Sequence, residues 1–325
     1  MTLGQLETFL AVARSGSVHA AATQRVVSDA SVSAAVAALE RELGAPLLER
    51  RGRGIRLTPA GEELARYAAQ ALGLLEQGRS AVQAASRPGQ GRLRLVAVTT
   101  AGEYLIPPIL SAFRQRHPGI EVLLEVGNRG AVLARLRTRD ADLGIGGRPP
   151  VGGDLAGEAV LPNDLVLIAA AGHALTRKRT VDAAALAREV WLLREEGSGT
   201  RATTLELMAT LGVEPAQVLT LGSNGSVRQG AIVGLGITLL SEQAVARELA
   251  SGIVARIPAP GLPLRRPWYA LYPGPTVEAG TAALTMAART FVAFLRSREA
   301  KRALTAALGA PIHRLNVNRT AKKSR

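Results

Sequence analysis

The first 44 residues carry apolar side chains at a helical spacing. In residues 3–14 they recur every three or four positions, and a glycine follows at position 16. The alanine-rich stretch 18–25 comes next, with Ser17 before it as a helix cap. This pattern predicts two short helices joined by a tight connection.

A third amphipathic segment begins after the dipeptide Val26-Val27. Ser28 is a favourable N-cap, and Gly44 ends the pattern, which predicts a helix over 28–43. We expect its apolar face to turn inward, a face made of Val32, Val36, Leu39 and Leu43. Two short helices and a turn, with a buried stripe on the second helix, are typical of a helix-turn-helix. The opposite face would then meet base edges in the major groove.

That opposite face is small and nearly uncharged. Serine can bond several bases, alanine can touch a thymine methyl group, and aspartate can accept from cytosine N4. Side chains of this size let the helix backbone come close to the groove floor. The candidate base contacts are Ser28, Asp29, Ala30, Ser33 and Ala34.

Positive charge follows in the stretch ERRGRGIRLTP, where two glycines permit a tight hairpin tip. We expect Arg53 to project from that tip into a narrow minor groove, while its neighbours contact phosphates. The candidate residues are Arg50, Arg51, Arg53 and Arg56. The alternative is a three-helix bundle whose arginines simply face solvent, although the wing at this spacing favours DNA binding.

A long helix is predicted from Pro59 to about residue 85, with a narrow apolar seam. The stretch SRPGQGR at 86–92 then breaks the pattern and indicates a hinge. The seam packs either on its own chain or on a second copy of the same helix.

From residue 92 the apolar runs become short and rich in β-branched residues and leucine, and helical segments alternate with them. This alternation predicts an α/β domain with a mainly parallel sheet. Ligands of such sheets sit beyond the carboxyl ends of the strands, where small polar loops open helices here. The candidate effector contacts are Thr99, Thr100, Asn128, Ser198, Thr200, Arg201, Asn224 and Ser226, with Arg228 as a further counter-charge. Taken singly, each hydroxyl or amide is also explained as an ordinary helix cap.

Composition narrows the class of protein. The chain has no cysteine and only four scattered histidines, so we expect no metal site, no other cofactor and no enzymatic activity. No apolar run approaches the length of a membrane span, and the N-terminus does not resemble a signal peptide, so a cytoplasmic location is expected. The net charge is +14, but the last 28 residues carry eight basic side chains against one acidic, which predicts a basic C-terminal tail at 298–325.

The motifs LETFLAVARSGSVHAAA, VSDASVSAAVAALERELGAPLLER and GRGIRLTPAGEEL together resemble the LysR-type transcriptional regulators. Three positions depart from the family's usual pattern. Asp29 replaces a glutamine, which puts the family's usual base contact in doubt, and Ala30 replaces a proline or serine. Arg25 replaces an apolar residue, and this change would loosen the packing of its helix or send the side chain out to a phosphate.

The resemblance implies a multi-domain α+β protein. It would comprise a winged helix-turn-helix at 1–58, a linker and dimerisation helix at 59–91, and an effector domain at 92–297. The effector domain would resemble periplasmic solute-binding proteins, with two Rossmann-like subdomains formed by 92–163 plus 267–297 and by 164–266. Hinges are expected near Pro162 and Arg266.

The resemblance also implies a set of partners. These are double-stranded DNA with an interrupted palindrome, a small and anionic effector bound between the subdomains, and further copies of the chain in a homodimer or homotetramer. RNA polymerase is a further candidate. The alternative function is a solute-binding or enzymatic α/β protein with an incidental helical N-terminal domain.

Overall fold

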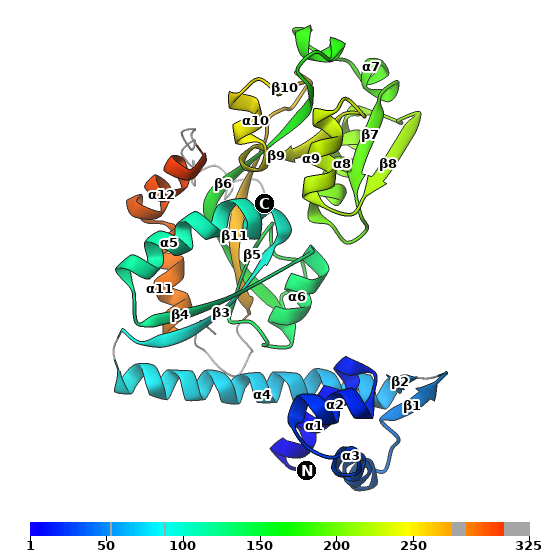
Figure 1. The fold of residues 1–325 in the computed structure, drawn as a ribbon, viewed down its shortest axis with the longest axis vertical. Coiled ribbons are helices and arrows are strands. Elements are labelled where there is room, and N and C mark those ends of the chain that lie inside the picture. The colour runs from blue at the N-terminus through cyan, green and yellow to red at the C-terminus, as the bar shows by residue number, and fades with distance from the viewer. Residues whose placement is uncertain (53, 88, 275–283, 309–325) are drawn as a thin grey trace. The chain divides into compact units, whose positions relative to one another are not determined.

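The computed structural model describes residues 1–52, 54–87, 89–274 and 284–308. The chain forms two compact units, which are described separately. One consists of residues 1–86 with 137–140, and the other of residues 87–136 with 141–325. Figure 1 shows the helices and strands of both units.

The first unit begins with three helices, α1 (Leu3–Ser15), α2 (Val18–Arg25) and α3 (Asp29–Leu43). A capping box between Thr2 and Gln5 starts α1, and the hydroxyls of Ser17 and Ser28 cap α2 and α3. These caps satisfy backbone N–H groups that a helix start leaves without partners. The predicted helix-turn-helix is therefore present, with the boundaries that the sequence pattern indicates.

An apolar core holds the three helices together. Phe9 of α1 and Leu39 of α3 are fully buried, and Val32 and Val36 are buried beside α2. Leu43 was expected in the same stripe, but it is 43% exposed. It is the last residue of α3, and the next residue already leaves the helix in a left-handed conformation. The expectation for Leu43 is wrong. Its side chain lies on the apolar face of α3, but at the end of a helix this position alone does not bury a side chain.

A two-stranded hairpin follows, formed by β1 (Leu48–Arg51) and β2 (Gly54–Leu57) in antiparallel pairing. The Glu40 side chain accepts hydrogen bonds from the backbone N–H groups of Leu47 and Leu48, and the N–H of Ile55 donates to the carbonyl of Gly16. The wing is thus fixed to α3 at one end and to the α1–α2 turn at its second strand.

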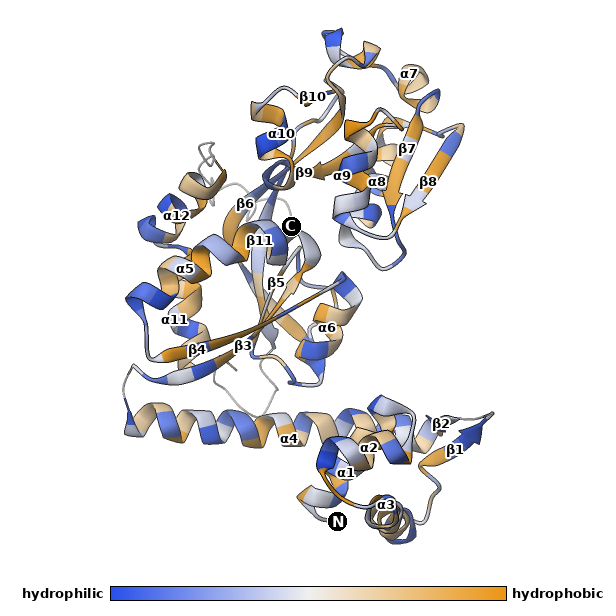
Figure 2. Cartoon of the chain, in the orientation of Figure 1, coloured by the Kyte–Doolittle hydropathy of each residue, from blue (hydrophilic) through white to orange (hydrophobic). Residues whose placement is uncertain are grey.

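Helix α4 (Pro59–Ser86) has 28 residues, and Thr58 caps its start, since its hydroxyl accepts from the N–H of Gly61. Ala68 and Ala69 pack against the core of the helix-turn-helix. Several large apolar side chains of this helix remain exposed: Tyr67, Leu74, Leu75 and Val82. The alternation of apolar and polar residues along this helix is visible in Figure 2.

Val26, in the turn between α2 and α3, has backbone angles φ 56° and ψ 48° and is 90% exposed. A β-branched side chain in this left-handed region is strained, whereas asparagine tolerates it. We expect Val26→Asn to raise the free energy of unfolding by about 1 kcal/mol. Thermal unfolding measures this. The neighbouring change Val27→Asn, at a residue without a positive φ, is the control and should bring no gain; equal effects of the two changes would contradict the strain argument.

The second unit has one seven-stranded sheet in the order β10-β6-β11-β5-β3-β4, with β9 also on β6. Its parallel part joins β4 (Ile120–Gly127), β3 (Gly91–Val98) and β5 (Leu143–Gly146). Helices α5 (Ile106–Arg116), α6 (Arg129–Arg137) and α11 (Met286–Leu295) accompany these strands, and a short π-helix, η1 (Ala101–Leu105), follows β3.

The remaining pairings of this sheet are antiparallel. Two long strands, β6 (Leu155–Ala170) and β11 (Leu264–Pro273), run side by side along ten residues with Pro162 opposite Pro267. β9 (Thr238–Ser241) and β10 (Val254–Arg256) pair antiparallel with β6. In this sheet, the expectation of mainly parallel strands is therefore correct only for β3, β4 and β5. The chain leaves the first subdomain along β6 and returns to it along β11, so these two strands run in opposite directions and pair antiparallel.

The second subdomain contains a small parallel sheet of β7 (Val190–Arg194) and β8 (Gln217–Leu221). Helices α8 (Gly199–Leu211) and α9 (Asn224–Ile232) follow these two strands, and shorter helices complete the layer: η2 (Ala174–Arg177), α7 (Ala183–Ala187), η3 (Glu242–Ala244) and α10 (Ala246–Ala250). Trp191 is fully buried in the core between the β-layer and α8. The two subdomains thus have separate apolar cores.

A helix, α12 (Arg298–Leu308), occupies the start of the segment that was expected to be a basic tail. Ala300 and Leu304 on its apolar face are fully buried in the core of the first subdomain, beside α5. The prediction of a tail from 298 is wrong over these eleven residues, because the charged side chains lie on one face of an amphipathic helix. The rest of the predicted tail lies outside the described residues.

Candidate functional site

The DNA-binding candidates of α3 lie on its solvent side. Ser28 caps the helix through its hydroxyl, and the four others are exposed in the first two turns: Asp29, Ala30, Ser33 and Ala34. Val32, between them, points into the core. The structure therefore brings the five predicted residues together on one surface at the N-terminal end of the second helix of the motif.

His19 of α2 is a neighbour of Asp29 that the sequence pattern does not single out. Its Nδ1 lies 3.3 Å from both carboxylate oxygens of Asp29, and both side chains are exposed. An imidazole that donates to the carboxylate orients it and offsets its charge on a surface that would approach phosphates. His19 and Asp29 are ten residues apart and lie on different helices, so the spacing of residues along one helix could not predict their contact.

The wing presents Arg50 and Arg51 to solvent from β1. Arg56, opposite on β2, is exposed but forms an ion pair with Glu49, its cross-strand partner. Arg53 lies outside the described residues. Arg25, for which loosened packing or a phosphate contact was expected, instead donates to Glu7 of α1 at 2.9 Å.

A cleft of about 660 Å³ opens in the second unit, between the two subdomains. Thr99 and Thr100 reach it after β3, Asn128 after β4, and Ser198 and Thr200 at the start of α8. Five of the eight predicted effector residues therefore meet in one cleft. The two crossing strands β6 and β11 supply further wall residues, namely Asn163, Leu165, Pro267, Trp268 and Tyr269.

The cleft is rich in arginine. Five arginines line it against a single acidic residue, Glu206: Arg129, Arg148, Arg194, Arg265 and Arg266. Burial lowers the pKa of Arg129, and the charge of Arg266 lowers it further, while Glu206 acts in the opposite direction. Arg266 is paired with Glu206 at 2.6 Å and Arg194 with Glu195, whereas Arg129 donates to the carbonyl of Arg148. The excess of arginine over acidic side chains in a partly buried site favours an anionic ligand. None of these five arginines was among the effector residues predicted from the sequence. Arg194 could have been, because it is the last residue of the strand before the GSGTR loop.

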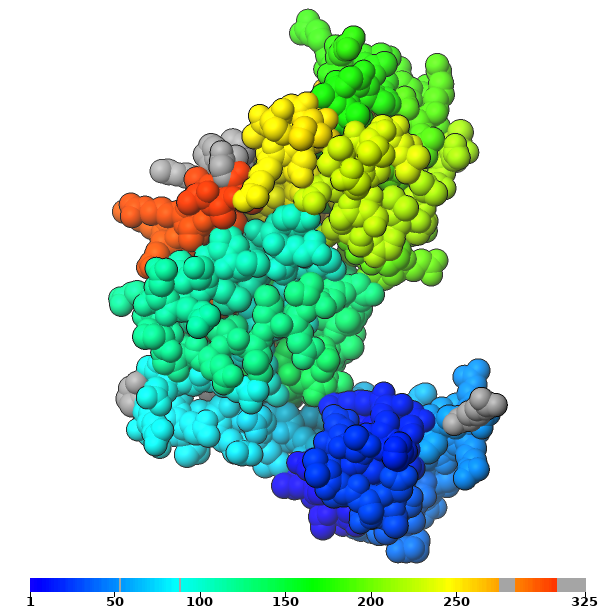
Figure 3. Space-filling view, viewed as in Figure 1, coloured from blue at the N-terminus to red at the C-terminus, as the bar shows by residue number. Residues whose placement is uncertain are grey.

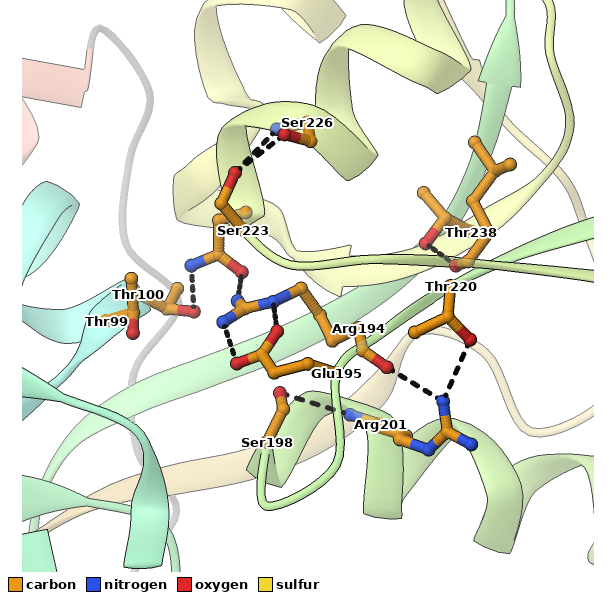
Figure 4. Close-up of polar contacts among 12 residues, drawn as sticks. Thr99, Thr100, Arg194, Glu195, Ser198, Arg201, Thr220, Ser223, Ser226 and Thr238 are labelled. Carbon is orange, nitrogen blue, oxygen red and sulfur yellow. Dashed lines mark hydrogen bonds and ion pairs between the residues drawn. The ribbon is translucent and has the colours of Figure 1, made fainter. Parts of the chain in front are cut away.

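Arg194 is buried and holds a network on the cleft wall (Figure 4). Its Nε and Nη2 donate to the carboxylate of Glu195, each at 2.7 Å, and its Nη1 donates to Oδ1 of Asn224. The side-chain hydrogen bonds from Arg194 hold the pKa of Glu195 below its ordinary value. The amide Nδ2 of Asn224 donates to the hydroxyl of Thr100 at 2.9 Å.

Three predicted effector residues do not line this cleft. Arg201 donates to the carbonyl of Arg194 and to the hydroxyl of Thr220, so it fixes the loop between β7 and α8. Asn224 is buried and accepts a hydrogen bond from Arg194, and Ser226 is exposed in the first turn of α9. Arg228, the other proposed counter-charge, contacts Tyr104 and Glu248. Only the tertiary structure separates these residues from those that face the cleft.

Metal and membrane sites are not found in the described parts of the chain. No group of three or more histidine, aspartate or glutamate side chains there could hold a metal ion. None of the described helices is long and apolar enough to cross a membrane.

The chain belongs to the LysR family of bacterial transcriptional regulators. Residues 3–62 match the family described as bacterial regulatory helix-turn-helix protein, lysR family, and residues 86–300 match the LysR substrate binding domain. A LysR-type regulator with an effector-binding domain is therefore the class that fold and sequence define. The alternative of an enzyme with an incidental N-terminal domain is excluded by this membership, because the homologues are regulators.

Among its relatives is the HTH-type transcriptional activator CmpR of Synechocystis, 34% identical over 90% of this chain and 94% of that protein. The regulator CbbR of Rhodospirillum rubrum is 36% identical over 89% and 97%. The regulatory domain of CcmR from Synechocystis, solved in complex with 2-PG, is 36% identical, with a TM-score of 0.58 over 64% of this chain and 96% of that domain.

Proposed function

We propose that the protein binds a specific duplex DNA in the cytoplasm through α3 and the β1–β2 wing. The single observation that carries this proposal is the surface on which Ser33 and Ala34 are exposed while Val32 and Val36 are buried. Ser28, Asp29, Ala30, Ser33 and Ala34 would read base edges, and Arg50, Arg51, Arg53 and Arg56 would hold the DNA backbone. An electrophoretic mobility shift with the DNA upstream of the gene tests this.

Arg51 gives the sharpest test of the wing. It is exposed on β1, so its charge would neutralise one phosphate on any duplex. We expect Arg51→Ala to weaken binding to operator and unrelated DNA by similar factors and to reduce the slope of log affinity against log salt by about 1. Arg79→Ala, which removes an exposed charge of α4 outside the helix-turn-helix and its wing, is the matched control. An unchanged slope for Arg51→Ala would remove the wing from the interface.

We further propose that the cleft binds a small anionic metabolite. Five arginines against one glutamate support this, together with the N-terminus of α8, where Ser198 and Thr200 stand. The contacts would come from Thr99, Thr100, Asn128, Ser198 and Thr200 and from the arginines of the cleft. The 2-PG complex of the CcmR domain agrees with such a ligand. Calorimetric titration of the full chain with 2-PG and with inorganic phosphate tests the proposal; no heat of binding with either would count against it.

The exposed apolar residues of α4 support a homodimer or homotetramer. Tyr67, Leu74, Leu75 and Val82 form a seam that a second copy of the helix would cover. In the proposed mechanism, two helix-turn-helix motifs hold the half-sites of an interrupted palindrome. Anion binding between the subdomains then changes how effector domains pack, which alters the DNA geometry that RNA polymerase meets.

A further inference from the structure

Asn224 connects the two subdomains through one side chain. It stands in the first turn of α9 and is 1% exposed. Its Oδ1 accepts from Arg194 of the second subdomain, and its Nδ2 donates to Thr100 of the first. Because a guanidinium has donors only, Oδ1 must face Arg194, and this fixes the amide so that Nδ2 faces Thr100.

A second contact crosses the same junction one turn farther along α9. Nη1 of Arg228 donates to the hydroxyl of Tyr104, in the π-helix η1, at 3.1 Å. Glu248 lies 3.5 Å from the same Nη1 atom. Nε of Arg228 is buried without a hydrogen-bond partner. Neither Tyr104 nor Arg228 lines the cleft. The surfaces over η1 and α9 meet at this junction in the space-filling view (Figure 3).

The direction of these hydrogen bonds matters for the cleft. The hydroxyl of Thr100 accepts from Asn224, so its own proton is left to donate elsewhere. The Arg194 side chain uses three of its five N–H donors on Glu195 and Asn224. Thr100 and Arg194 both line the cleft. With these bonds made, the Thr100 hydroxyl and the Arg194 guanidinium keep unused donors at the wall where an anion would bind.

We propose that Asn224 is a positioning residue for the effector, and that with the Tyr104–Arg228 contact it forms a latch between the subdomains. The latch holds the Thr100 hydroxyl and the Arg194 guanidinium in the arrangement that donates to an anionic ligand. This inference rests on the proposed anionic effector. Donors that are fixed before the ligand arrives lower the cost of ordering them on binding, and the chain from Asn224 through Thr100 strengthens the last donor.

The latch itself is tested without a ligand, by amide hydrogen exchange of the full chain. We expect Tyr104→Phe and Asn224→Ala each to speed exchange in η1 and in α9, on both sides of the junction. Gln229→Ala, at an exposed position of α9, should leave η1 as in the wild type. Faster exchange confined to the element that carries the substitution would overturn the latch. Tyr104→Phe removes a single oxygen, so this test stands even if Asn224→Ala fails to fold.

The positioning role is tested with 2-PG and inorganic phosphate as probes. Asn224→Ala should weaken their binding roughly tenfold and Tyr104→Phe roughly two- to tenfold, as expected for one or two net hydrogen bonds. If Asn224 acts through Thr100, then Asn224→Ala and Thr100→Val combined should weaken binding less than the product of the single effects. If the double substitution weakens binding by the full product of the two single effects, Asn224 does not act through Thr100, and the positioning role is wrong.

The two proposals fail in different ways. If wild-type protein binds neither probe while the exchange result holds, the anionic effector and the positioning role are wrong and the latch remains. If the wild type binds both and the Asn224 variant binds equally well, the positioning role is wrong and the anionic effector stands.

Discussion

Arg129→Gln is expected to weaken anion binding by roughly tenfold to a hundredfold, as loss of a charged hydrogen-bond donor does. Arg129 lines the cleft, and its pKa is lowered by burial and by the charge of Arg266. Burial disfavours the charged form, but Arg129 also donates to the carbonyl of Arg148 at 2.7 Å. These two contributions oppose each other, so the same change should alter the stability of the unliganded effector domain little. Loss of binding together with retained stability is the signature of a functional charge.

Two measurements separate the effect of Arg129→Gln on anion affinity from its effect on stability. Thermal unfolding without ligand gives the stability, and calorimetric titration with 2-PG gives the affinity. Arg135→Gln is the matched control, since it removes the same charge from the same helix at a position that does not line the cleft and that pairs with Glu125. An Arg129 variant that binds 2-PG as tightly as the wild type would show that Arg129 is not part of the effector site.

Leu39→Ala is expected to lower the free energy of unfolding of the DNA-binding unit by about 2–5 kcal/mol, the usual cost of a cavity at a fully buried leucine. Leu39 packs with Phe9 and Leu47 in the core that joins α1, α3 and the wing. A loss of this size is a large part of the stability of so small a domain. DNA binding should therefore fall, while the separate core of the effector domain and its anion affinity persist.

Leu43→Ala provides the same chemical change one turn later on the same helix. Leu43 is 43% exposed, so we expect a loss below about 1 kcal/mol. Circular dichroism during thermal unfolding resolves the two variants, and a mobility shift at the temperature of highest stability compares their DNA binding. If Leu39→Ala and Leu43→Ala lower the free energy of unfolding by the same amount, α3 does not pack as described.

The helix-turn-helix was predictable because its signals are local. Caps at Ser17 and Ser28, the glycines at the helix ends and the apolar spacing of α1 and α3 all act within a few residues. The prediction failed at Leu43, where the helical period gives the correct face but not the extent of the partner surface. It also missed the contact between His19 and Asp29, which depends on the angle between two helices.

The effector cleft was predictable in part. The loops after β3 and β4 lie together because neighbouring parallel strands of one sheet end at a common edge, and Thr100 and Asn128 follow from that rule. Ser198 follows β7 of the other, two-stranded sheet, so its loop reaches the same cleft from the second subdomain. The rule does not say which way a long side chain turns. Arg201 and Arg228 were therefore chosen as counter-charges although they fix loops and helices, and Arg129 and Arg266 were missed.

The sequence by itself determined the family and most of the elements with their order, because caps, turns and apolar periods act between near neighbours in the chain. The tertiary structure alone decided which arginines face the cleft, that Asn224 spans two subdomains, and that residues 298–308 pack beside α5. Those outcomes depend on residues more than a hundred positions apart, as Thr100 and Asn224 are. Their proximity is set by how the sheet and helices pack, and no local pattern encodes it.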